Sequence, residues 1–170
     1  MPTLILARHA KAEAPAAGLD DSARALELIG RKASTRLGQV IAEAGYTPTL
    51  ALVSPSVRTQ QTWKLMAAGL PACETVTEDE LYETHVGGIL EVLHGLGDTD
   101  TVVIVGHEPT SSAAAAHLAG PGSDKTALQR VAHGLPTATA AVLEFDCPWS
   151  EVTSRCGRLV AVLSGRDVEE

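Results

Sequence analysis

Short apolar runs alternate with longer amphipathic stretches along the chain. Each of the short runs is rich in aliphatic and β-branched side chains, which predicts a buried strand. Five such runs occupy residues 3–7, 49–53, 101–105, 139–145 and 159–163, and residues 76–77 suggest a further short strand. Several of these runs end abruptly in polar or charged residues, so the strand ends are the first places to look for chemistry.

Apolar residues spaced three and four apart predict helices between the strands. In residues 29–44 this spacing places one apolar stripe on a helix of about four turns, which Gly45 ends. The next helix is expected to begin with Ser54 as N-cap and Pro55 as its first residue. Further helices are predicted over residues 89–96 and 109–118, and the Ala-, Gly- and Pro-rich residues 12–23 are interpreted as a surface loop.

The alternation of strands and helices predicts an α/β fold with three layers. A mostly parallel central sheet would have helices on both faces, and its last strands could be antiparallel. After a Gly- and Pro-containing loop at residues 119–123, the rest of the chain is expected to complete the sheet. A chain of 170 residues fits one domain, so we predict a single domain over residues 1–170.

Charge and cysteine content narrow the function classes. The formal net charge of −8 argues against nucleic-acid binding, which needs a basic face. Three cysteines without a CxxC pair fit neither a disulfide framework nor a zinc site, and the cytoplasm is the simplest expected location. No basic and apolar leader and no apolar run long enough to span a membrane is seen, so membrane insertion is not expected.

Arginines and histidines follow three of the predicted strands. Arg8 and His9 come directly after the first, Arg58 lies in the helix after the second, and His107 follows residues 101–105. Because the carboxyl ends of parallel strands share one edge of a sheet, these four side chains should meet there. They would form an anion site, since guanidinium groups hold phosphate oxygens with paired hydrogen bonds. A cation such as Arg58 near a helix N-terminus also calls for an anion close by.

The motifs that contain these residues resemble those of the histidine phosphatase superfamily. The resemblance is strongest to small phosphohistidine phosphatases of the SixA type and covers nearly the whole chain. It rests on Arg8-His9-Ala10, Ser54-Pro55, Arg58, Gln61-Thr62 and Gly106-His107. The family usually has Gly where Ala10 stands, which is a mild departure. The resemblance implies a phosphoglycerate mutase-like fold.

The same resemblance implies phosphoryl transfer through a covalent phosphohistidine on His9. Arg8, Arg58 and His107 would then bind the phosphate oxygens, with no cofactor and no metal. A Leu-x-Glu segment often supplies the general acid in this family, and Leu81-Tyr82-Glu83 fits, which makes Glu83 the candidate. Glu80 is a nearby alternative, so the choice between these two carboxylates stays open.

Chain length also bears on the substrate. Residues 84–100 leave no room for the inserted cap of larger relatives, so the cleft should be shallow and suit a phosphoryl group carried on a protein. The resemblance points to phosphohistidine, with inorganic phosphate as product. A small-molecule phosphomonoesterase and a non-catalytic phosphoprotein-binding module are the alternatives. A metallohydrolase is disfavoured because no HxH or HxxxH spacing occurs.

The remaining basic candidates have no matching motif. Lys11 could reach the rim of the site or be solvated. The other histidines are expected to be structural or on the surface: His85, His94, His117 and His133.

Overall fold

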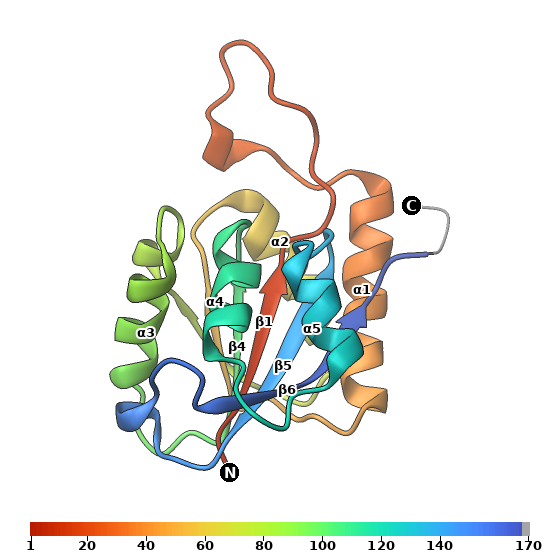
Figure 1. The fold of residues 1–170 in the computed structure, drawn as a ribbon. Helices are drawn as coiled ribbons and strands as arrows, with labels where there is room; N and C mark the ends of the chain where they lie inside the picture. The colour runs from red at the N-terminus through yellow and green to blue at the C-terminus, as the bar shows by residue number, and fades with distance from the viewer. Residues whose placement is uncertain (168–170) are drawn as a thin grey trace.

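The computed structural model describes residues 1–167, so residues 168–170 of the predicted domain lie outside the described part. Six strands form one sheet in the order β3-β2-β4-β1-β5-β6 (Figure 1). The strands are β1 (Thr3–Arg8), β2 (Leu50–Val53), β3 (Glu74–Thr77), β4 (Thr101–Gly106), β5 (Thr139–Phe145) and β6 (Gly157–Ser164). All six predicted strands are therefore present, each within two or three residues of its expected bounds.

The sheet is mostly parallel, as expected. β4 pairs in parallel with β1 and with β2, and β2 pairs in parallel with β3. Only β5 runs against its neighbours, because it pairs antiparallel with both β1 and β6. The carboxyl ends of β1, β2 and β4 therefore lie at one edge of the sheet, and this edge carries the candidate site.

Helices cover both faces of the sheet and confirm the three-layer prediction. They are α1 (Leu28–Glu43), α2 (Val57–Ala67), α3 (Val86–His94), α4 (Thr110–Leu118) and α5 (Lys125–Ala132). Alternate residues of β1 belong to two separate cores: Ile5 and Ala7 pack with α1 and α2, whereas Leu4 and Leu6 pack with the other three helices. Figure 1 shows α4 and α5 in front of the sheet. The buried apolar residues of both faces hold the strand ends in place.

Two sequence expectations about helices were wrong. The helix after β2 begins at Val57 with Ser56 as N-cap, whose hydroxyl accepts a hydrogen bond from the Thr59 amide at 3.3 Å. Ser54 instead continues the sheet ladder, since its amide donates to Val105. The second error concerns α5, because the residues after 123 were expected only to complete the sheet. Its apolar stripe is short, with only Ala127 and Val131 buried.

A long loop stands over the carboxyl edge of the sheet. It joins β1 to α1, contains the short 3-10 helix η1 (Asp21–Ala23), and is the orange-red segment at the top of Figure 1. The base of the loop is tied by backbone hydrogen bonds from Glu13 to Ala25 and from Glu27 to Lys11. The predicted surface loop therefore lies beside the candidate site, with its two ends joined by hydrogen bonds. Among residues 1–167, no helix has the length and apolar character needed to cross a membrane.

Candidate active site

All five candidate residues line one cavity of about 320 Å³ at the carboxyl edge of the sheet. The sequence candidates are Arg8, His9, Arg58, Glu83 and His107. The structure adds four lining residues that the sequence reading did not select: Asp21, Arg24, Tyr82 and Glu108. The cavity therefore combines the predicted cations with an unexpected set of partners.

The register of β1 against β4 brings the two histidines together. Arg8 pairs with Gly106 across the two strands, so His9 and His107 each follow at the same height. The His9 amide donates to the Gly106 carbonyl at 3.1 Å, which extends the ladder by one bond. The ring centroids of His9 and His107 lie 5.5 Å apart. Residues almost one hundred positions apart in the chain thus face the same small space.

The His9 ring is held in one tautomer. Its Nδ1 lies 2.7 Å from the Ala10 carbonyl oxygen, and because that oxygen can only accept, Nδ1 carries the proton. The lone pair of the neutral ring is then on Nε2. Burial, followed by the positive charges nearby, lowers the pKa of His9 to about 4, so the ring is neutral at physiological pH. His9 therefore presents an unprotonated nitrogen in a cavity lined with cations.

His107 is neutral for the same physical reason. Burial first, and then the neighbouring Arg58, lower its pKa to about 4. Its Nε2 shares a 2.7 Å hydrogen bond with the Ser54 hydroxyl, which can donate or accept. The sequence predicted Ser54 as a helix cap, but its hydroxyl instead orients the His107 ring.

The side chain of Arg8 is anchored by the segment that follows α5. Its Nη1 donates to the Leu135 carbonyl at 2.9 Å, and burial lowers its pKa. Its Nε is buried without a hydrogen-bond partner, as is the Nε of Arg58. Buried donors are normally paired, so two orphaned guanidinium nitrogens at one site are what an anion-binding pocket leaves unsatisfied.

Arg58 lies in the first turn of α2, where the sequence analysis called for a nearby anion. That anion is Asp21: Arg58 donates to its carboxylate at 2.9 Å and to its backbone carbonyl at 2.8 Å. Only 7% of the Arg58 side chain is exposed, whereas 52% of Asp21 is exposed. A buried guanidinium is therefore neutralised by a carboxylate that reaches in from the loop.

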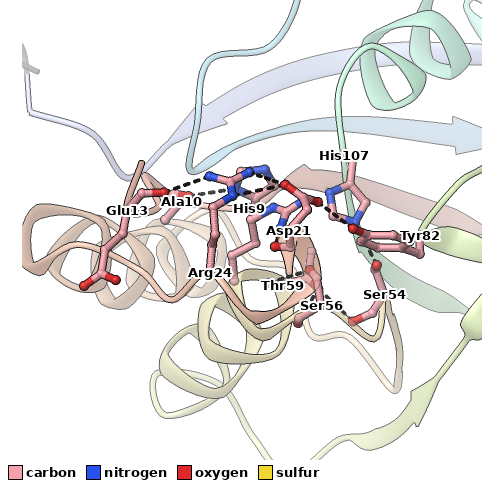
Figure 2. A network of polar contacts seen from close by, with 11 residues as sticks. His9, Ala10, Glu13, Asp21, Arg24, Ser54, Ser56, Thr59, Tyr82 and His107 are labelled. Atoms are coloured by element: carbon pink, nitrogen blue, oxygen red, sulfur yellow. Dashed lines mark hydrogen bonds and ion pairs between the residues drawn. The ribbon is translucent and has the colours of Figure 1, made fainter. Parts of the chain in front are cut away.

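Asp21 also binds Arg24 and Tyr82 (Figure 2). The Tyr82 hydroxyl donates to the Asp21 carboxylate at 2.5 Å, and Arg24 donates to its other oxygen at 2.8 and 3.1 Å. The Tyr82 bond and then Arg24 hold the pKa of Asp21 well below its usual range, and the same bond raises the pKa of Tyr82. No sequence period marks these three residues. Asp21 and Arg24 are marked in the sequence by their spacing of three residues, and Tyr82 stands in the Leu81-Tyr82-Glu83 segment that pointed to Glu83.

Three carboxylates near the site differ in their position relative to the cavity and in their hydrogen bonds. Glu83 lines the cavity and is exposed, whereas Glu80 lines a different cavity beside α3. The carboxylate of Glu108 accepts hydrogen bonds from the Ser112 amide, the Ser112 hydroxyl and the Leu135 amide. Of these three, Glu83 is the carboxylate that combines a place at the cavity with freedom from such anchoring bonds.

Gln61 and Thr62, which follow Arg58 in α2, connect this helix to the His9 segment and to the loop. The Thr62 hydroxyl accepts from the Ala10 amide at 3.0 Å and donates to the Arg58 carbonyl at 2.7 Å. The Gln61 side chain accepts from the Leu26 amide at 2.8 Å. These bonds tie the His9 segment and the base of the loop to α2.

The other basic residues lie outside the cavity. Lys11 forms an exposed 3.6 Å ion pair with Glu27. His94 and His133 each donate to a backbone carbonyl, and His85 accepts from the Gly88 amide at the start of α3. Within residues 1–167, no three His, Cys, Asp or Glu side chains are grouped so that they could hold a metal ion.

The two site histidines should titrate unusually low. We expect the His9 ring to take up its proton with a midpoint near pH 4 rather than near 6.5. Since the unfolded chain binds this proton at higher pH, the free energy of unfolding should fall as pH drops from about 6.5 to about 4. Titration of the ring signals by NMR, with His9→Ala for assignment, measures the midpoint. A midpoint at 6 or above would contradict the neutral, buried ring.

Comparison with known proteins agrees with this geometry. The model of the histidine phosphatase superfamily (branch 1) matches residues 4–94. The uncharacterized protein Rv1276c of Mycobacterium tuberculosis is 33% identical over 155 residues, which cover 90% of this chain and 96% of that protein. The sequence match thus includes the segments that carry Arg8, His9, Arg58 and Glu83.

Solved structures extend the match over the fold. The "putative phosphohistidine phosphatase SixA" of Nakamurella multipartitia has a TM-score of 0.82 and 28% identity, covering 95% of this chain and 94% of that one. The corresponding protein of Agrobacterium tumefaciens has a TM-score of 0.79 and 27% identity, covering 96% and 98%. The chain therefore belongs to the histidine phosphatase superfamily, as a phosphatase of the SixA type.

Proposed function

We propose that the protein removes the phosphoryl group from phosphohistidine carried on another protein, through a covalent phosphohistidine on Nε2 of His9. One observation carries the proposal: the His9 proton is fixed on Nδ1 by the Ala10 carbonyl, inside a cavity lined by Arg8, Arg58 and His107. A neutral imidazole with its free lone pair among cations is suited to attack phosphorus.

In the first step, the Nε2 lone pair of His9 forms a bond to phosphorus. The bond between phosphorus and the substrate nitrogen breaks, and the electron pair of that bond stays on the departing imidazole, which takes up a proton. Arg8, Arg58 and His107 bind the phosphoryl oxygens during the transfer. Fixed donors of this kind stabilise the charge distribution of the transition state without reorganising.

In the second step, a water oxygen attacks the phosphorus of phospho-His9. The phosphorus–nitrogen bond breaks, its electron pair returns to Nε2, and inorganic phosphate leaves. Glu83 is the group we assign to proton transfer, because it is at the cavity and its carboxylate is exposed. It would give a proton to the leaving group in the first step and accept one from water in the second.

The shape of the site supports a protein-borne substrate. Between Tyr82 and β4 the chain forms only α3 and its connections, and α3 packs on the sheet rather than over the cavity. Glu83 and the Asp21 loop, both exposed, border the opening. A histidine side chain on another protein can therefore reach His9. The names of the two SixA-type relatives point the same way.

A substrate comparison tests the proposal. We expect the purified protein to dephosphorylate a phosphohistidine protein faster than small phosphate esters, measured as kcat/KM. Glu83→Gln should slow ester hydrolysis more than phosphohistidine hydrolysis, because an alkoxide needs a proton more than an imidazole does. Efficient ester hydrolysis with no action on the phosphohistidine protein would instead identify a small-molecule phosphomonoesterase. Phosphate binding without turnover of either substrate would identify a binding module.

A further inference from the structure

We propose that the Asp21 carboxylate is an internal competitor for the phosphoryl group, and that a phosphoryl group binds by taking over the donors that Asp21 holds. This inference rests on the proposed function, because it assumes that the cavity binds a phosphoryl group. It assigns a binding role to a loop residue outside the motifs that carried the family resemblance.

The carboxylate of Asp21 is held as a bound anion would be held. Its two oxygens accept hydrogen bonds from two guanidinium groups and one phenol, those of Arg24, Arg58 and Tyr82. All four residues line the cavity that contains His9 and His107. Figure 2 shows Asp21 beside Arg24 and Tyr82 next to His107, with the Tyr82 and His107 ring centroids 5.6 Å apart. A phosphoryl group bound at Arg8, Arg58 and His107 would compete with Asp21 directly for Arg58, and Arg24 and Tyr82 lie in the same cavity.

The attachment of Asp21 permits exchange. Its side chain is 52% exposed, and it lies in a three-residue 3-10 helix without any buried residue. The base of the loop is held separately, by the backbone bonds of Glu13 and Glu27 and by the bond from the Leu26 amide to Gln61. Asp21 can therefore leave Arg58 without unravelling the base of the loop.

The difference in charge favours a phosphoryl group over the Asp21 carboxylate at these donors. A phosphoryl group carries up to two negative charges and three acceptor oxygens, whereas Asp21 offers one charge and two oxygens. The phosphoryl group can thus displace the carboxylate, but it must do so at the cost of the contacts that Asp21 loses. A carboxylate that remained nearby would also repel a dianion. Both effects mean that Asp21 weakens phosphate binding. Once the carboxylate is displaced, Arg24 and Tyr82 become available as donors to the bound phosphoryl group.

Calorimetric binding of inorganic phosphate tests this role without any need for turnover. Asp21→Asn keeps the shape and the acceptor oxygen of the side chain and removes its charge, so we expect phosphate to bind about tenfold tighter than to the wild type. Asp20→Asn is the matched control, because Asp20 lies in the same loop, is exposed, and makes no capping bond. We expect its affinity to stay within about twofold of the wild type.

The outcomes separate this inference from the proposed function. Equal affinities of Asp21→Asn and Asp20→Asn would overturn the role of Asp21 alone. Weaker binding by Asp21→Asn would also overturn it, and would show that Asp21 serves to orient Arg58. If neither the wild type nor any variant bound phosphate, the proposed function would fail together with this inference. Circular dichroism and the thermal midpoint of each variant confirm that the loop changes leave the fold intact.

Discussion

His9→Ala is expected to reduce kcat by about 10³-fold or more, the largest effect of any single substitution in this chain. The substitution removes the nitrogen that would form the bond to phosphorus, and no second neutral imidazole can replace it. His107 lies close by, but its Nε2 is already engaged with the Ser54 hydroxyl. The measurement is kcat and KM on a phosphohistidine protein, together with acid-quench trapping of radiolabelled phosphate on the enzyme.

His117→Ala is the matched control for this experiment. His117 is exposed near the end of α4 and does not line the cavity, so its loss should leave both kcat and the trapped label unchanged. Label retained on His9→Ala would show that another residue is the nucleophile. If His9→Ala lost the label but kept the wild-type kcat, water would attack the substrate directly, without a covalent intermediate.

Arg58 should give the second largest effect. We expect Arg58→Lys to lower kcat/KM by about 10²–10³-fold, because a lysine keeps the charge but offers no planar pair of donors for phosphoryl oxygens. The loss should be shared between KM and kcat, since Arg58 would bind the phosphoryl group in the ground state and stabilise it more strongly in transfer. Steady-state kinetics on the same phosphohistidine protein give both terms.

The control for Arg58 uses the same helix. Lys64 is exposed on α2, and Lys64→Ala removes one positive charge without touching the cavity, so kcat/KM should stay near the wild-type value. Because Arg58 is buried, the thermal midpoint of Arg58→Lys must be compared with that of the wild type. A stable Arg58→Lys protein with unchanged kcat/KM would rule out a direct role for this guanidinium.

Local patterns were sufficient to predict most of the fold. Within residues 1–167, the six strands follow from short apolar runs, and α1 and α3 follow from apolar spacings of three and four, because burial of these residues on a sheet face is what stabilises them. The helices α2 and α4 were expected from the prolines near their starts. α5 was missed because its buried stripe is only Ala127 and Val131, too short to stand out from a loop. The start of α2 was misplaced because Ser54 and Ser56 are equally good caps, and only the sheet ladder decides between them.

The sequence by itself determined which chemistry the site could hold, since Arg8, His9, Arg58 and His107 each follow a strand whose carboxyl end must lie at one edge of the sheet. Only the tertiary structure decided which side chains contact these cations. The loop from β1 to α1 folds back over this edge and brings Asp21 to Arg58, 37 residues further along the chain, and to Tyr82, 61 residues further. Such contacts follow from the path of a loop in space rather than from any period in the sequence, so a pattern of hydrophobic and polar residues contains no sign of them.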